Sequence, residues 1–402
     1  MYLNIAILAA VLITGLALWS PRAHRSHVWR AMTTPLASII GSGFLVLGPI
    51  LNTAYGKFAP IVMAGLCLSA YLYGWAIRHN IADIVVSGDG RGALVERLET
   101  VASWLLGVAY IVSVAYYLNL FGAFGVSLTP VADALHAKFL TSAVFVLILY
   151  VGWTRGFKTL ERFEYVAVTA KLAIIAGLLV GLAVYFFGKV EDSALVFNPP
   201  DRMGWPALTL AFGLIVTVQG FETSRYLGAE YDSRTRVQSM RWAQWVSTLI
   251  YMSYILLLAF VFEQSDLALS ETAIVGIMGV VAPVLPALLV TAALAAQFSA
   301  AVADTSGSGG LFAEVTKRRV SPRQAYVILV GVGLVLTWSA NIFEIISYAS
   351  RAFAGYYMLQ AAIAALTSWR KAGPGWRSLS FAALAVVGLM IVVFGEPAEG
   401  GG

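Results

Sequence analysis

The stretch Pro35-Leu36-Ala37-Ser38-Ile39-Ile40-Gly41-Ser42-Gly43-Phe44-Leu45-Val46-Leu47-Gly48-Pro49 lies in a long apolar run and carries two glycines and a serine near its middle. Glycine and serine are weaker helix formers than alanine or leucine. At the middle of a membrane a backbone group that loses its helical hydrogen bond finds no water to replace it. Two interpretations are open. The small residues let helices pack closely, or the helix breaks at mid-membrane and its freed N–H groups face an anionic group.

The composition of the whole chain places this stretch in a membrane protein. Of 402 residues, 59% are hydrophobic and only 12% are charged, with a mean hydropathy of +0.81. A soluble domain carries roughly 25% charged residues, so the composition excludes a soluble enzyme or a nucleic-acid module as the main body. The net charge of +5 therefore concerns which side of the membrane the basic residues occupy.

Cysteine and histidine usage gives no sign of a metal or cofactor. The single cysteine, Cys67, has no partner for an internal disulfide, and the four histidines lack the spacing of metal ligands. The intramembrane ionisable residues are few and include no nucleophile–base pair, so we expect no cofactor and no enzymatic activity.

Long apolar runs predict an all-α integral membrane protein with about twelve transmembrane helices, because a helix needs roughly 20 residues to cross the hydrocarbon core. The runs are 3–19, 36–54, 59–77, 100–127, 139–153, 163–187, 207–221, 243–262, 284–303, 325–339, 342–367 and 378–394. Those at 139–153 and 207–221 are short and must borrow flanking residues. The first run has no cleavage site after it, so we expect a retained helix rather than a signal peptide.

The positions of the basic residues predict the orientation. Every second connection is rich in Lys and Arg, and together these six hold 20 of the 26 basic residues: 20–33, 78–99, 154–162, 222–241, 316–323 and 369–377. The positive-inside rule puts these connections in the cytoplasm and both termini outside. The apolar stretch Thr272 to Leu285 is either a helix over the outer mouth or an extension of the ninth span.

A second apolar segment is interrupted in the same way as the first. It begins at Pro206, which suits a first helical turn, and contains Gln219-Gly220-Phe221-Glu222. Gly-interrupted segments at corresponding places in two halves of a chain indicate a transporter site.

Three short motifs resemble the amino acid-polyamine-organocation (APC) permeases. Ile40-Gly41-Ser42-Gly43-Phe44 resembles the string in their first core helix, and Gly220-Phe221-Glu222, followed by Ala229-Glu230, resembles their sixth. Thr169-Ala170-Lys171-Leu172 is similar to the lysine-leucine pair of their fifth core helix. The resemblance covers about 34 to 368.

The resemblance implies a LeuT-type fold of five plus five helices in inverted repeat, with one extra N-terminal helix. The expected parts are the extra helix with its basic inner loop, two repeats separated by an outer linker, and a final helix with an acidic tail: 1–33, 34–187, 188–205, 206–368 and 369–402. This chain departs from the family pattern after the ninth span. The permeases usually continue there with a longer stretch, whereas this chain reaches Lys317-Arg318-Arg319 within a few residues.

Lys171 is the leading candidate for ion coupling. It lies about eight residues into its span, roughly 12 Å deep, and an intramembrane ionisable group is a functional candidate by default. The alternative is a structural cation satisfied by carbonyls of a broken helix. The resemblance implies that Lys171 takes the place of a sodium ion between the first and eighth core helices, which favours protons over sodium.

Three other residues complete the predicted coupling set. Glu222 can take a proton, hold the unwound backbone or pair with Arg225 on the next turn. Asp304 is a partner for Lys171 or a cation ligand, or else a cap for the following segment; Ser299 lies on the same span. Arg351 lies within the eleventh span and has no predicted role; Glu344, seven residues earlier on the same helix face, is its one candidate partner.

The expected substrate site surrounds the two interruptions. We place the substrate carboxylate near the N–H groups of Ser42 and Gly43, and an ammonium near the carbonyls of Gln219 and Gly220. Phe221 is either an aromatic lid or a packed core residue. Tyr110 is one of several tyrosines in the fourth span; it is the one we expect at the site, and the alternative is that these aromatic residues only pack against neighbouring helices. The full expected set is Ile40, Gly41, Ser42, Gly43, Tyr110, Gln219, Gly220 and Phe221.

The sequence thus predicts a secondary transporter of amino acids or related small amines and organic acids in the cell (inner or plasma) membrane. It works by alternating access and is proton-coupled or exchanging, with no nucleic-acid partner. Two alternatives stay open: a sodium-solute symporter of the same fold, and a membrane sensor or assembly subunit that does not transport.

Overall fold

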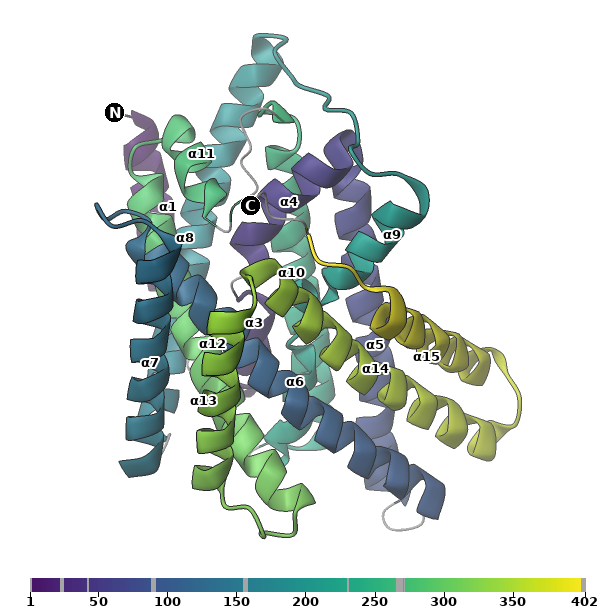
Figure 1. Ribbon diagram of the computed structural model, residues 1–402. Coiled ribbons are helices and arrows are strands. Elements are labelled where there is room, and N and C mark those ends of the chain that lie inside the picture. The colour runs from purple at the N-terminus through teal and green to yellow at the C-terminus, as the bar shows by residue number, and fades with distance from the viewer. Residues whose placement is uncertain are drawn as a thin grey trace.

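The computed structural model describes residues 2–21, 25–41, 43–87, 92–154, 158–229, 231–264, 270 and 272–398. All regular secondary structure in these residues is helical (Figure 1). The elements before the second interruption are α1 (Tyr2–Leu18), α3 (His27–Ile39), α4 (Gly43–Tyr55), α5 (Ala59–Ser87), α6 (Ala93–Val126), α7 (Ala134–Thr154) and α8 (Lys158–Glu191). The later elements are α9 (Gly204–Gly213), η3 (Ile215–Val218), η4 (Phe221–Ala229), α10 (Ser233–Leu258), α11 (Ala273–Val281), α12 (Leu285–Val315), α13 (Pro322–Ser339), α14 (Ile342–Ala372) and α15 (Trp376–Phe394).

Both predicted interruptions are confirmed. The second apolar run is two helices, because α3 ends at Ile39 and α4 begins at Gly43. The seventh run has only ten α-helical residues in α9, and then continues as the 3-10 segments η3 and η4 around an extended Gln219. Gly220 has φ +115°, a backbone conformation that residues with a side chain rarely adopt.

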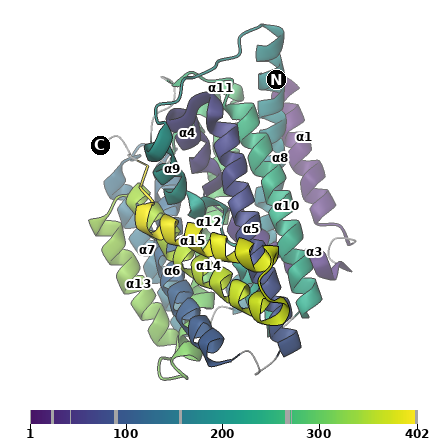
Figure 2. The same cartoon turned by 90° about the vertical axis from the view of Figure 1, so that its right-hand side faces the viewer.

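Two groups of helices enclose the interruptions. α10 packs against α3, η4 and α5, whereas α6 packs against α7 and α12, and α13 against α7 and α12. In Figure 1 α7 and α13 lie on one side of the molecule and the α14–α15 hairpin on the other. Figure 2, turned by 90°, shows α1 running beside α8 on the far side from α7 and α13. The first interrupted segment contacts both groups, because α3 packs against α10 and also against α12.

One predicted segment boundary needs correction, and one alternative that the sequence left open is decided. The ninth run ends at 303 in the sequence account, but α12 continues as helix through Gly307-Ser308-Gly309-Gly310 to Val315. The stretch from Thr272 forms its own helix, α11, which ends where Ala282 turns to extended backbone. The glycines do not break α12. One of them, Gly309, lies against Tyr326 of α13, where a Cβ would be 2.3 Å from the ring, so the contact between the two helices needs a glycine there.

Six helical segments of the described chain are long and apolar enough to cross a membrane by length and composition. They are Gly43–Ile84, Ala93–Val126, Ala134–Thr154, Tyr165–Glu191, Leu285–Val315 and Trp376–Phe394. Helices such as α10 and α14 fall outside this set because they carry buried polar side chains, including Gln244 and Gln360, that lower their hydropathy.

Candidate functional site

The two interruptions pack directly against each other through glycine. A Cβ on Gly43 would lie 2.8 Å from Thr217 Cβ, and a Cβ on Gly220 would lie 2.4 Å from Ser38 Cβ and 2.6 Å from Ile39 N. Each break therefore has a glycine where the backbone of the other break approaches. The motif glycines are explained by this reciprocal contact as well as by the interrupted helices.

Tyr251 of α10 ties the two interruptions together. Its hydroxyl lies 2.8 Å from the carbonyl oxygen of Ile39 and 2.6 Å from that of Thr217, and it donates to both as a shared hydrogen bond. These carbonyls lack helical partners because each helix stops just beyond them. One buried side chain thus satisfies the free ends of two segments that are far apart in the sequence.

Lys171 satisfies the first interruption from α8. Its Nζ donates to the carbonyl oxygen of Ala37 at 2.6 Å, and only 1% of the side chain is exposed. Ala37 is in the last turn of α3, where carbonyls have no partner within the helix. Lys171 is therefore a buried cation that donates to a carbonyl of the broken helix, and its role in coupling stays a prediction.

Glu222 supports the second interruption. Its Oε2 accepts hydrogen bonds from Gly220 N at 2.9 Å and from the Tyr357 hydroxyl at 2.8 Å. Of the three hypotheses for this residue, the one in which it holds the unwound backbone is confirmed. The pairing with Arg225 is wrong, because Arg225 instead forms an ion pair with Glu99 of α6 at 2.7 Å.

Two buried acceptor atoms at the second interruption have no partner within the described residues. Gln219 donates from Nε2 to the Tyr117 hydroxyl at 2.9 Å, which leaves its Oε1 without a hydrogen bond. Glu222 Oε1 is buried without one as well. A buried polar atom without a partner costs about 1–3 kcal/mol, so this place favours a ligand that donates hydrogen bonds.

The two predicted aromatic residues, Phe221 and Tyr110, lie beside the second interruption. Phe221 is buried and stacks on Tyr357, with ring centroids 5.1 Å apart. Tyr110 packs edge-on against Phe353 of α14 and lines a cavity of about 290 Å³ with Tyr226 and Gly307. Tyr110 therefore stands at a cavity next to the interruptions, one helical turn before Ser113 of the same helix.

The remaining predicted residues lie on α12. Asp304 is buried and accepts a hydrogen bond from Ser113 of α6, so it does not act as a cap for the segment that follows. Ser299 is buried and donates to Ala296 of its own helix at 3.2 Å. Ser42, which the sequence places at the centre of the substrate site, lies outside the described residues.

A family model described as "APC superfamily transporter" matches residues 21–395. The chain belongs to the APC superfamily of transporters. An uncharacterized protein of Aquifex aeolicus (strain VF5) is 42% identical over 386 residues, which is 94% of each chain. Family membership and the apolar helices make this a multi-pass membrane protein of a transporter family.

Several polar residues of this APC-superfamily chain were missed or misplaced by sequence reasoning. Arg78 and Arg225 fall in predicted basic connections, but Arg78 is buried within α5 and donates to Gln244 of α10. Arg351 does not pair with Glu344, since it donates to the Gly395 carbonyl after α15. Ser350 of α14 donates to the Gly213 carbonyl at 2.6 Å and accepts from Val216 N at 3.1 Å.

No sequence signal connects most of these partners, because contact pairs such as Tyr251 and Ile39 are separated by 212 residues. The one usable signal is a polar side chain within an apolar run, which marks Tyr251, Ser350 and Gln360 only as residues in need of a partner.

Proposed function

We propose that the chain is a secondary active transporter of amino acids or related small amines and organic acids, working by alternating access with proton coupling or exchange. The observation that carries this proposal is the direct contact of two interrupted helices. The buried cation Lys171 of α8 binds the first of them, and the buried carboxylate Glu222 belongs to the second. Interrupted helices that face each other place free backbone groups of both kinds in one site.

The proposed architecture is the LeuT-type inverted repeat of about twelve spans. The halves are 34–187 and 206–368, joined by 188–205, with α1 as the extra helix of 1–33 and α15 in 369–402. The support is that equivalent helices of the two halves pack alike. The third helix of each half contacts the fifth helix of the other half: α6 packs against α14, and α12 packs against α8. The basic connections support a cell-membrane orientation with both termini outside.

The proposed substrate site lies between the interruptions. A substrate carboxylate binds the N–H groups at the start of α4, near Ile40, Gly41, Ser42 and Gly43, where a helix N-terminus favours an anion. A substrate ammonium binds at Gln219 and Gly220. The buried Oε1 atoms of Gln219 and Glu222 support this, because both can accept a hydrogen bond and neither has a partner in the described residues.

The proposed coupling group is Lys171, with Glu222, Ser299 and Asp304 as further members. The support for Lys171 is that its buried ammonium donates to the Ala37 carbonyl, which would place a fixed positive charge where a coupling cation would otherwise bind. If Lys171 lost its proton, the first interruption would lose a positive charge and one hydrogen-bond donor. That interruption forms one wall of the proposed substrate site. Protonation and the shape of the site are then linked.

The first experiment identifies a ligand. Purified protein is screened by thermal shift against amino acids, amines and organic acids, with the matching alcohols and amides as controls. A ligand at 100 times its Kd stabilises the fold by about 2.7 kcal/mol. We expect a hit to lose its stabilising effect when the carboxylate or the amine that it carries is replaced by the neutral group of the control compound.

The second experiment tests transport of that ligand in proteoliposomes by counterflow. Flux of the labelled ligand is expected from the function proposed here. Binding without flux would replace transport by the sensor alternative, and uptake that needs sodium at fixed pH would replace proton coupling by sodium symport.

A further inference from the structure

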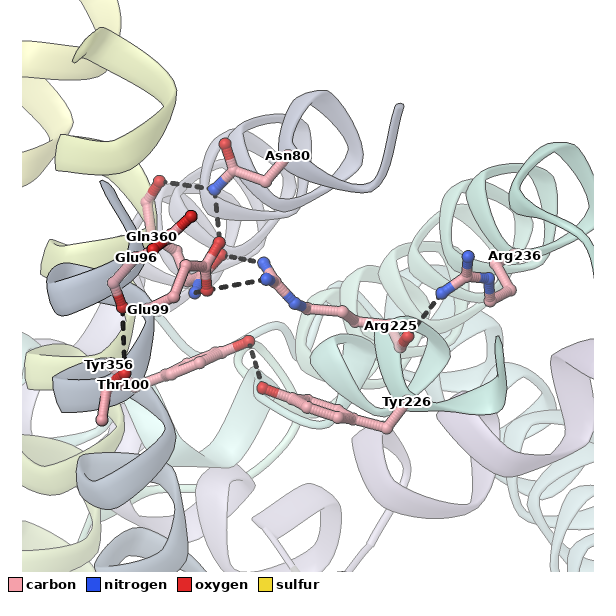
Figure 3. Close-up of polar contacts among 9 residues, drawn as sticks. All are labelled: Asn80, Glu96, Glu99, Thr100, Arg225, Tyr226, Arg236, Tyr356 and Gln360. Atoms are coloured by element: carbon pink, nitrogen blue, oxygen red, sulfur yellow. Dashed lines mark hydrogen bonds and ion pairs between the residues drawn. The ribbon is translucent and has the colours of Figure 1, made fainter. Parts of the chain in front are cut away.

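A polar cluster on the inner side of the second interruption joins four helices to η4 (Figure 3). Arg225 leaves η4 and meets two partners: Glu99 of α6 at 2.7 Å, and the side-chain oxygen of Gln360 of α14. Figure 3 shows the guanidinium pointing between these two side chains. η4 is thereby attached to both α6 and α14.

The cluster extends to two further helices. Gln360 donates to Glu99 at 3.2 Å, and Asn80 of α5 donates to the side-chain and backbone oxygens of Gln360 at 2.9 and 2.8 Å. Arg236 of α10 donates to the Arg225 carbonyl at 2.7 Å. The next residue of η4, Tyr226, meets Tyr356 hydroxyl to hydroxyl at 3.2 Å.

Burial makes this cluster different from a surface ion pair. The exposed fractions of the Arg225 and Glu99 side chains are 9% and 15%, so water screens their attraction little. Exposed pairs contribute almost nothing to stability, whereas removing one partner of a buried pair leaves an uncompensated charge. Arg225 is therefore held in place only while Glu99 and Gln360 remain close.

Beside the cluster lies a hollow that leads to the inner end of the molecule. The cavity of about 290 Å³ is lined by Tyr110, Tyr226 and Gly307. A second cavity of about 650 Å³ shares Gly310 and Glu314 with it and continues to Arg318 and Ser321. The glycines of α12 leave this path open, and η4 forms its wall through Tyr226.

We propose that Asn80, Glu99, Arg225 and Gln360 form an inner lock that holds η4 against α6 and α14, and that opens when the site connects to the inner hollow. The proposal rests on the transport function proposed above. When the lock opens, Arg225 exchanges its buried partners for water, and the wall at Tyr226 moves away from Tyr110. The deep end of the hollow then widens.

Cysteine accessibility of the hollow tests the lock. Gly307→Cys is a deep reporter, since Gly307 lines the cavity of about 290 Å³ and does not line the one of about 650 Å³. Its Cβ would lie 3.3 Å from the Tyr110 ring, which must shift by a few tenths of an ångström. Gly310→Cys is a shallow reporter, since it lines both cavities and its Cβ meets nothing within 4 Å. Cys67 is buried and is replaced by Ser in all variants.

In the lock variants Glu99→Gln and Gln360→Leu, a bulky maleimide is expected to label Gly307→Cys about fivefold faster or more, the lower range for coupling between two sites. Labelling of Gly310→Cys stays unchanged. The matched control is Lys371→Gln, which breaks another ion pair, Lys371–Asp83 at 2.6 Å between α14 and α5, without touching η4. It is expected to leave both labelling rates unchanged.

Equal deep labelling in wild type and both lock variants would overturn the lock, as would an equal increase in Lys371→Gln. If Glu99→Gln does not fold, Gln360→Leu decides, because it keeps the Arg225–Glu99 pair. The measurement needs no substrate, so a protein that labels as expected but moves no ligand contradicts the proposed function and leaves the lock standing.

Discussion

The two interruptions differ in how their backbone groups are satisfied. The first receives its donors from distant helices, Lys171 on α8 for the Ala37 carbonyl and Tyr251 on α10 for the Ile39 carbonyl. The second carries its own acceptor, since Glu222 binds Gly220 N within the same segment. The first break thus depends on side chains from α8 and α10, whereas the second adds a carboxylate of its own to the hydroxyl groups that Tyr251 and Ser350 supply from α10 and α14.

This difference assigns opposite tasks to the two buried charges. Lys171 supplies a proton donor to carbonyls at the end of α3, and Glu222 supplies an acceptor to an N–H at the start of η4. Both follow from the polarity of helix ends, where carbonyls are free at the C-terminus and N–H groups at the N-terminus. Substitutions at each break test how far the fold depends on these contacts.

Gly220→Ala is expected to have the largest effect. The substitution needs a residue with a side chain at φ +115° and a Cβ 2.6 Å from the Ile39 nitrogen, so the two breaks cannot keep their contact. We expect a loss of more than about 4 kcal/mol, in the exceptional range for one mutation, seen as loss of folded protein in size-exclusion chromatography. Gly310→Ala, with nothing within 4 Å, is the control, and similar losses in both would contradict the contact.

Lys171→Met is expected to destabilise more than Glu222→Gln. Methionine leaves the Ala37 carbonyl buried without its donor, at a cost of about 1–3 kcal/mol. Glutamine keeps an oxygen that can accept from Gly220 N and Tyr357, so a cost below about 1 kcal/mol is expected. Thermal unfolding in detergent measures both, and the reverse order would show that the first break does not depend on its distant cation.

Tyr251→Phe tests whether one hydroxyl joins the breaks. It removes the donor to the Ile39 and Thr217 carbonyls and is expected to cost about 1–2 kcal/mol and to weaken ligand binding. Tyr254→Phe on the same helix is the matched control, because its hydroxyl lies 3.4 Å from the Leu45 carbonyl and contributes less. Equal melting temperatures for the two variants would remove the joining role.

Ser350→Ala is expected to have the smallest effect, because it touches only the second break. The loss of two hydrogen bonds to Gly213 and Val216 should cost about 0.5–1.5 kcal/mol. Ser347→Ala, one turn earlier on α14, removes a buried hydroxyl without a partner in the described chain and should be neutral. A larger loss in Ser347→Ala would mean that the hydrogen bonds of Ser350 carry no weight.

The sequence predicted the interruptions and the buried lysine because each leaves a local mark. Glycines within an apolar run mark a weak helix, and a lysine deep in a span marks a group that needs a partner. The Glu99–Arg225 pair leaves no such mark: Glu99 lies at the start of a helix and Arg225 in a run rich in basic residues, where both look like loop charges. Their burial depends on how η4 packs against α6, which only tertiary structure sets.

Uptake by the Lys171→Ala variant tests the central claim most directly. The ligand found by thermal shift is followed into proteoliposomes with and without an imposed pH gradient, at constant sodium, for wild type and variant. The account predicts uptake that follows the gradient in wild type and no pH-dependent uptake in Lys171→Ala. Unchanged uptake with unchanged pH dependence in the variant would contradict it.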